Sequence, residues 1–381
     1  MAGTGGVPGE PEPHPRMRSP NTQYLGRLDH LRFYAAALVL VYHYFHQFVG
    51  NVAFHNPLAS LVNEGHVGIG LFMVLSGFIF SVIAQGKDIH YGWFVYNRFI
   101  RIYPLYIFAV FLAVTLMVYN HEQVTRSAFD ILGWLLAFRP ATIVEVPYFP
   151  HLWTIPVEFS FYLLFPFLHA FFTRYGPKYF LGVLTLMLLV RTGVYIEYGT
   201  VRFLAYETLF GRLDQFLIGY LCGWLYSMQK GEKWLGFPPT LLLAFSVLLA
   251  AISWLNHQGG SHNMEAGWWV VWPLVEALAW AWVVMSYMYC RLSVPGLIDR
   301  SLSRLGEYSF SIYVVHMFVV ILAARRIGLL GLSSNVAVDA TLSALLTALP
   351  ITLLLAALTF AVIEKPFLSF RKVYVRKKPT S

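Results

Sequence analysis

The sequence predicts an all-α integral membrane protein, a bundle of about ten transmembrane helices with both termini in the cytoplasm. Hydrophobic residues make up 57% of the 381 residues and charged residues only 12%, which is about half the charged share of a soluble domain. The apolar residues gather in runs long enough to cross a bilayer as helices, and no run alternates as the strands of a membrane barrel do. The basic residues lie in the short segments between these runs, which is the pattern that sets membrane topology.

The apolar runs, taken in chain order, give the ten expected spans: residues 28–50, 66–85, 95–118, 151–173, 179–197, 203–228, 238–256, 268–290, 305–324 and 338–363. With the N-terminus assigned to the cytoplasm, nineteen of the 27 Lys and Arg residues fall on the cytoplasmic side, six on the outer side and two within spans. This bias supports ten spans, because adding or removing one would reverse the side of every later loop.

Residues 28–367 are expected to form one transmembrane domain. Residues 1–27, rich in Pro and Gly, are expected to be a disordered cytoplasmic tail, and residues 368–381 a basic cytoplasmic tail. The net charge of +8 does not indicate a nucleic-acid partner, because the basic residues lie in short loops instead of on one soluble face. The two cysteines, Cys222 and Cys290, form neither a disulfide framework nor a metal-binding spacing, and no metal is expected.

The first span, LDHLRFYAAALVLVYHYFHQFVG, carries two side chains that do not belong in hydrocarbon, Arg32 and His43. Their separation of eleven residues comes to roughly 20° past three full turns, so they share one helix face about 16 Å apart along the axis. This spacing indicates a polar track that enters the membrane. The alternative is that Arg32 snorkels to the headgroups and His43 hydrogen-bonds to a neighbouring helix.

Around the second and third spans, two features suggest a cytoplasmic binding corner. Arg98 and Arg101 are three residues apart and are expected to share one face at the start of a helix. Two guanidinium groups on one face suit bidentate phosphate binding, although any cytoplasmic helix end carries arginines for topology. In the second span, Gly77 allows close helix packing and Ser76 offers a hydroxyl, for which a packing role is the simpler interpretation.

The fourth span places His151 and Glu158 about two turns apart on one face, with Glu158 within the membrane. A carboxylate there needs a partner, a proton or a wet cavity; an ion pair to an arginine is the structural alternative. His316 in the ninth span is, taken alone, most simply a satisfied core histidine. Further charges in expected spans imply a bundle with a polar interior: Glu207, Arg212, Asp214 and Glu276.

Six motifs in order resemble those of the multi-pass membrane acyltransferase family 3 between about Leu28 and Phe367. They are LDHLR with His43, GLFMVLSGF, RFIRIYPLY, HLWTIPVEFSFY, EYSFSIYVVH and EKPF. Two positions depart from the family pattern. His30 stands where the family often has Gly, and Phe159 stands where it often has a second acidic residue, which leaves Glu158 as the carboxylate available there.

The resemblance implies an enzyme that uses an acyl-CoA, expected to be acetyl-CoA, on the cytoplasmic side. Arg98 and Arg101 would hold the donor phosphates, and Arg32 would guide the thioester inward. His43 would be the general base or a transient acyl carrier, a task that suits a group titrating near neutral pH. Glu158, on the outer half, would orient the acceptor hydroxyl or His43. Three residues are secondary candidates: His151, His316 and Ser76.

By the same resemblance, the acceptor is a hydroxyl of a glycan or lipid-linked sugar that arrives from the outer side, and the expected location is the bacterial inner membrane. Arg32 and His43 would then line a single passage in which the thioester meets the acceptor. The main alternative is a multi-pass transporter or flippase of a lipid-linked sugar, since buried charges in ten spans fit that function too. Transporters usually show two matched halves. Here the motifs GLFMVLSGF and HLWTIPVEFSFY occur once each, so no internal symmetry supports a transporter. A non-enzymatic scaffold or receptor is a further alternative.

Overall fold

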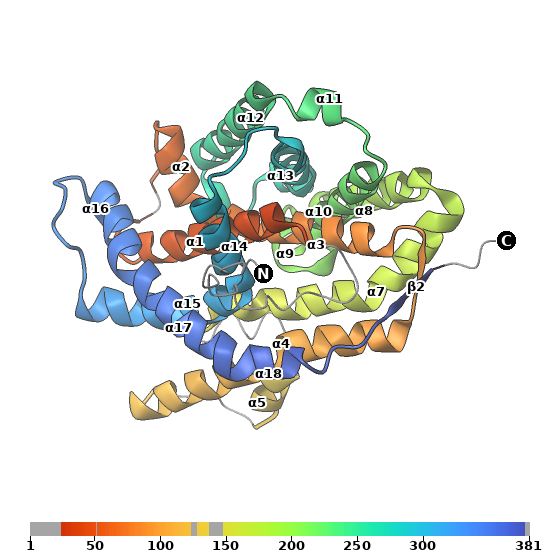
Figure 1. Cartoon of the computed structure of the whole chain (residues 1–381). Helices are drawn as coiled ribbons and strands as arrows, with labels where there is room; N and C mark the ends of the chain where they lie inside the picture. The colour runs from red at the N-terminus through yellow and green to blue at the C-terminus, as the bar shows by residue number, and fades with distance from the viewer. Residues whose placement is uncertain (1–23, 51, 123–127, 137–147, 378–381) are drawn as a thin grey trace, which may run out of the picture.

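The computed structural model describes residues 24–50, 52–122, 128–136 and 148–377, which form a helical bundle (Figure 1). The long helices are α1 Gly26–Phe45, α3 Gly68–Ala84, α4 Tyr91–Tyr119, α7 Thr154–Tyr175, α8 Pro177–Tyr198, α10 Leu209–Ser227, α12 Pro238–His257, α13 Trp272–Tyr289 and α15 Ser309–Arg326. The last long segment consists of α16 Val336–Ser343, the π-turn η5 Ala344–Ala348, α17 Leu349–Thr359, the π-turn η6 Phe360–Glu364 and α18 Lys365–Leu368.

Short elements connect these helices. They are α2 Pro57–Asn63, α5 Ala128–Leu135, α9 Arg202–Glu207, α11 Glu232–Leu235, α14 Gly296–Glu307, the 3₁₀ turns η1 Gly65–Val67, η2 Pro150–Trp153, η3 Gly260–His262 and η4 Gly267–Val270, and the strands β1 Lys87–Ile89 and β2 Val375–Lys377. Most of the predicted N-terminal tail, residues 1–23, and the last residues of the predicted C-terminal tail, 378–381, lie outside the described residues.

Seven helical segments within the described part of the chain are long and apolar enough to cross a membrane: Gly65–Ala84, Tyr91–Tyr119, Pro150–Tyr175, Pro177–Tyr198, Pro238–His257, Ser309–Arg326 and Val336–Leu368. The protein is therefore an integral membrane protein. The other three predicted spans form helices α1, α10 and α13, which carry charged residues such as Arg32, Asp214 and Glu276. The count of ten spans and the cytoplasmic termini stay predictions.

Glycine lets α3 and α10 pack with their backbones almost in contact, as predicted for the second span. A Cβ added at Gly77 would lie 2.0 Å from the Phe216 carbonyl oxygen, and one at Gly219 would lie 2.1 Å from the Val74 carbonyl oxygen. Only glycine fits such an approach between membrane helices. This contact fixes α3, which also packs against α1, as one wall of the region described below.

The predicted polar interior is confirmed. Arg191 and Asp214 form a buried ion pair with Nη2 and Oδ2 2.6 Å apart. The Arg212 guanidinium lies 3.8 Å from the Glu276 carboxylate and 4.2 Å from the centre of the Tyr206 ring. These groups meet between neighbouring helices, where they avoid contact with lipid.

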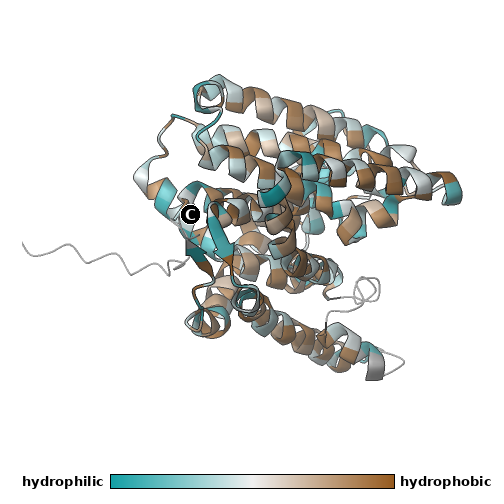
Figure 2. Cartoon of the chain, turned by 90° about the vertical axis from the view of Figure 1, so that its right-hand side faces the viewer, coloured by the Kyte–Doolittle hydropathy of each residue, from teal (hydrophilic) through white to brown (hydrophobic). Residues whose placement is uncertain are grey.

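The all-α prediction is correct for the described residues apart from one small sheet. β1 and β2 pair antiparallel, with Lys87 opposite Lys377 and Ile89 opposite Val375. β2 follows the last helix, so part of the segment predicted as a basic cytoplasmic tail, residues 368–381, folds back onto the connection between α3 and α4. Figure 2 shows this hydrophilic strand close to the C-terminus, beside helices in which hydrophobic residues predominate.

Candidate functional site

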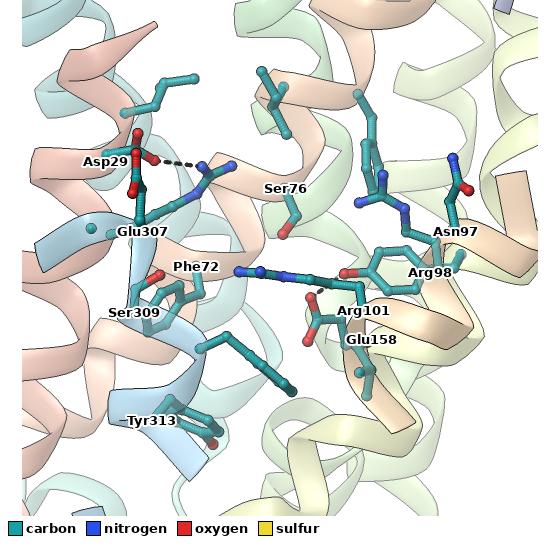
Figure 3. Close-up of a pocket in the computed structure, with 18 of the residues that line it drawn as sticks. Asp29, Phe72, Ser76, Asn97, Arg98, Arg101, Glu158, Glu307, Ser309 and Tyr313 are labelled. Atoms are coloured by element: carbon teal, nitrogen blue, oxygen red, sulfur yellow. Dashed lines mark hydrogen bonds and ion pairs between the residues drawn. The ribbon is translucent and has the colours of Figure 1, made fainter. Parts of the chain in front are cut away.

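A cavity of about 300 Å³ lies among α1, α3, α4, α7, α15 and the segment after α18 (Figure 3). Its lining includes seven charged residues: Asp29, Arg32, Arg98, Arg101, Glu158, Glu307 and Arg371. The apolar lining comes mainly from Ile69, Phe72, Met73, Ile79, Phe80, Ile102 and Phe310. A concave site with an apolar wall and a few converging charged groups is the usual form of a small-molecule site.

Helix α4, which carries two of these guanidinium groups, begins four residues before the span that the sequence predicts. The helix begins at Tyr91, where the His90 side chain accepts a hydrogen bond from the Trp93 backbone N–H. Arg98 and Arg101 therefore lie in the second and third turns instead of at the start of the helix. The Arg98 guanidinium lies 5.2 Å from the centre of the Phe80 ring, a favourable cation–π contact, and its Nε atom has no hydrogen-bond partner among the described residues.

Arg101 is partly neutralised by a carboxylate from the end of the chain. Its Nη1 lies 2.8 Å from Glu364 Oε2, and Ser311 donates a hydrogen bond to the other oxygen of Glu364. Glu364 closes the π-turn η6, a helix irregularity of the kind often found at functional sites. Figure 3 shows the Arg101 side chain extending across the cavity, with Glu158 beside it.

Glu158 lines the same cavity as Arg98 and Arg101, whereas His43 does not line it. That Glu158 lies on the outer half and orients the acceptor hydroxyl or His43 stays a prediction. Its carboxylate accepts a hydrogen bond from Tyr162, one turn further along α7. A carboxylate in the membrane is thus accommodated by a cavity and by nearby guanidinium groups, as such a group requires.

Arg32 and Ser76 complete the predicted part of the cavity. Arg32 donates to Asp29 one turn earlier in α1, with Nη1 and Oδ1 2.8 Å apart, and Figure 3 draws this pair at one side of the cavity. Its side chain keeps 31% of its surface exposed. Ser76 on α3 faces the cavity, so its hydroxyl is available to a ligand as well as to packing.

Three predicted histidines form a separate cluster. The ring of His316 lies 4.5 Å from that of His151 and 5.3 Å from that of His43, measured between centres. His316 Nδ1 is 2.6 Å from the Tyr313 carbonyl oxygen and therefore donates to it, while His316 Nε2 has no partner among the described residues. No group of three or more His, Cys, Asp or Glu within the described ranges is arranged to hold a metal ion.

The histidine cluster and the cavity meet at a wall made by Thr154 and Tyr313. Both residues line the cavity. The Tyr313 hydroxyl donates to the His151 carbonyl oxygen at 2.7 Å and lies 2.8 Å from the Thr154 hydroxyl. His43 does not line the cavity, so the prediction that Arg32 and His43 line a single passage is wrong for this structure: the wall comes from α7 and α15, which helix periodicity within α1 cannot reveal.

Arg371 is a cavity residue that the sequence reasoning missed. It follows α18 in a stretch of basic residues that is typical of a cytoplasmic tail. Burial, together with the neighbouring charges of Arg101 and Arg98, holds the pKa of the Arg371 guanidinium below its ordinary value. Three guanidinium groups thus gather at one end of the cavity, in a pattern suited to an anionic ligand.

The chain is similar to known proteins over nearly its whole length. The model of an acyltransferase domain matches residues 25–363. Acyltransferase MdmB of Streptomyces mycarofaciens is 23% identical over 384 residues, which cover 95% of each chain. O-acetyltransferase OatA of Staphylococcus aureus is 24% identical over 233 residues, 55% of this chain and 36% of that protein. Peptidoglycan O-acetyltransferase OatA of Listeria monocytogenes is 23% identical over 180 residues, 42% of this chain and 27% of that protein. No solved structure matches the chain.

Proposed function

The chain belongs to the membrane acyltransferase family that this domain model describes, and from this premise we propose that it moves an acetyl group from cytoplasmic acetyl-CoA to a hydroxyl of a glycan outside the membrane. That the protein is an acyltransferase follows from the family and from its named relatives, which decides against the transporter alternative. The donor, the direction of transfer, the acceptor and the bacterial inner membrane as its location are the proposed parts.

The observation that carries the proposal is the cavity with Arg98, Arg101 and Arg371 at one end. Acyl-CoA brings a diphosphate and a further phosphate, which guanidinium groups bind with short, charge-assisted hydrogen bonds. These arginines lie on the side that the distribution of basic residues assigns to the cytoplasm. The apolar wall formed by Ile69, Phe72 and Met73 suits the acyl thioester end of the donor.

In the proposed reaction, Arg98 and Arg101 hold the phosphates, Arg32 guides the thioester inward, and His43 acts from the other side of the wall. His43 takes the proton of the acceptor hydroxyl, whose oxygen attacks the thioester carbonyl carbon. The carbon–sulfur bond breaks, and the CoA thiolate leaves with the proton that His43 received. The hydrogen bond between Tyr313 and Thr154 has to open for this step, because it closes the cavity against the histidines.

The acceptor is proposed from the relatives, two of which are named for O-acetylation and one of these for peptidoglycan. The acceptor sugar and the transferred acyl group are identified by mass spectrometry of cell-envelope glycans and small metabolites from cells with and without the protein. An acetyl group present on a glycan only when the protein is made supports the proposal. If the glycans are unchanged and an acylated small metabolite forms only when the protein is made, the proposed glycan acceptor is overturned.

The catalytic proposal is tested with His43→Ala in the purified full chain, with labelled acetyl-CoA as donor. Loss of a general base lowers turnover by about 10²- to 10⁴-fold, whereas acetyl-CoA binding and the unfolding temperature stay as in the wild type. His257→Ala is the matched control, because His257 is exposed and lies outside the cluster. Retained transfer in His43→Ala would move the base role to another group, with Glu158 first to be tested.

A further inference from the structure

The segment that follows the last helix is fixed to the rest of the protein instead of trailing from it. We call residues 369–377 the C-terminal strap. Its end forms β2, which pairs with β1 between Ile89 and Lys87. The His90 backbone N–H donates to the Tyr374 carbonyl oxygen at 2.8 Å, and the Tyr374 side chain is only 2% exposed. The strap is thus held to the beginning of α4.

One buried side chain clamps the strap directly beside Arg371. Asn97, which is 1% exposed, donates from Nδ2 to the Lys372 carbonyl oxygen at 2.7 Å. Its Oδ1 accepts from the Lys372 backbone N–H at 2.9 Å. Both halves of the amide are therefore used on a single residue of the strap. Because Asn97 precedes Arg98 in α4, this clamp sets the position of Arg371 relative to Arg98.

Arg371 brings a charge into the cavity that no carboxylate neutralises at short range. No Asp or Glu oxygen of the described residues lies within 4.0 Å of its guanidinium, whereas Glu364, the carboxylate at this end, pairs with Arg101 at 2.8 Å. Arg98 is likewise without such a partner in the described part of the chain, and Figure 3 shows it beside Asn97. Bringing these like charges together costs free energy, which an anion bound between them offsets.

We propose that the C-terminal strap is part of the donor site and that Arg371 binds a phosphate group of the donor, as a third cation beside Arg98 and Arg101. This inference rests on the proposed acyl-CoA donor. It makes donor recognition depend on the phosphates and on a segment outside the transmembrane helices. A donor that offers only the pantetheine thioester has no group for Arg371 to bind.

The test compares two thioesters that share the acetyl-pantetheine end. Equilibrium binding of acetyl-CoA and of acetylpantetheine, which has no phosphate, is measured on the purified full chain in detergent. Arg371→Gln is expected to weaken acetyl-CoA binding by about 10- to 100-fold, the loss for a hydrogen bond to a charged group, and to leave acetylpantetheine binding unchanged. The control is Arg376→Gln, since Arg376 is an exposed strap residue that does not line the cavity.

Asn97→Leu provides a second variant that releases the strap without removing a charge. It is expected to weaken acetyl-CoA binding as well, and its effect combined with Arg371→Gln should be much less than the product of the two, because both act through the same contact.

Acetyl-CoA binding that is unchanged in Arg371→Gln overturns the inference while leaving the proposed donor in place. An equal loss for both thioesters with a lower unfolding temperature also overturns it, because the role of Arg371 would then be structural. Wild-type protein that binds neither thioester overturns the proposed donor itself, and with it the ligand of Arg371.

Discussion

Arginine occupies two kinds of position in this protein. Arg191 and Arg212 are each 1% exposed, and each lies beside a carboxylate, Asp214 at 2.6 Å and Glu276 at 3.8 Å. The cavity residues Arg98 and Arg371 have no such partner within 4.0 Å among the described residues. A charge inside a membrane bundle needs compensation. For Arg191 and Arg212 the chain supplies a carboxylate at short range, which fits a structural role. For Arg98 and Arg371 it supplies none within 4.0 Å among the described residues, so an anionic ligand can provide the compensation.

The largest expected effect is a loss of unfolding free energy when a buried ion pair is broken, which distinguishes the paired arginines from the cavity arginines. Asp214→Ala leaves the Arg191 guanidinium buried without its partner, which costs about 3–5 kcal/mol of unfolding free energy. Thermal unfolding of the purified protein measures this loss. The exposed carboxylate variant Glu265→Ala is the control and should unfold like the wild type. An unchanged unfolding temperature in Asp214→Ala would mean that the buried pair contributes nothing and that the comparison fails on its structural side.

The opposite result is expected at Arg98. Arg98→Ala removes a phosphate partner, so the KM for acetyl-CoA should rise by about 10- to 100-fold, which is roughly 1.4–2.8 kcal/mol. The unfolding temperature should fall much less than in Asp214→Ala, because no ion pair is broken. Steady-state kinetics with varied acetyl-CoA and unfolding of the same samples provide both measurements. An unchanged donor KM with less folded protein would assign Arg98 to topology alone.

The sequence predicts the helices and the polar interior well because both follow from local rules. Apolar runs mark membrane helices, and the arrangement of buried charges follows from the cost of exposing them to lipid. The sequence also predicts that Arg32, Arg98 and Arg101 belong to one site, because their positions on helix faces and the motif resemblance both indicate it. All three line the cavity.

The parts that were missed depend on contacts between distant segments. The Tyr313–Thr154 wall joins α15 to α7, and nothing in the spacing within α1 indicates that it separates Arg32 from His43. The backbone of the strap is hydrogen-bonded to the Asn97 side chain and to β1, and bonds made by the backbone leave little trace in a run of basic residues. Its composition fits a topological tail equally well, so Arg371 was not recognised as a cavity residue.

Arg101 shares features with both kinds of arginine, because it lines the cavity and also pairs with a carboxylate, Glu364. A single substitution at Glu364 should make it resemble Arg98 and Arg371. Glu364→Gln removes the negative charge at 2.8 Å from Arg101 but keeps an oxygen that accepts from Ser311. The freed guanidinium should bind the donor more tightly, lowering the KM for acetyl-CoA by about two- to fivefold, in the range of a partly exposed ion pair. Kinetics with varied donor measure the change, and Glu265→Ala again serves as the control. A higher KM would show that Glu364 positions Arg101 for the donor instead of competing with it.

Salt provides an effect of similar small size and tests the cavity arginines and the buried ion pairs in one protein. Raising the ionic strength from about 0.1 M to about 1 M shortens the Debye length from about 10 Å to about 3 Å. Arg101 and Arg371 line the cavity and are both partly exposed, so ions can reach them. The KM for acetyl-CoA should therefore rise, by about threefold if screening removes roughly 0.7 kcal/mol of attraction. Both side chains of the Arg191–Asp214 pair are 1% exposed, so screening should leave its contribution to stability almost unchanged.

The KM for acetyl-CoA and the unfolding temperature are measured across the same salt series, with a neutral osmolyte as the control for effects of solute concentration. If the KM stays constant, the cavity arginines are not attracting phosphate through solvent-accessible charge, and their difference from the buried pairs would then be one of geometry alone.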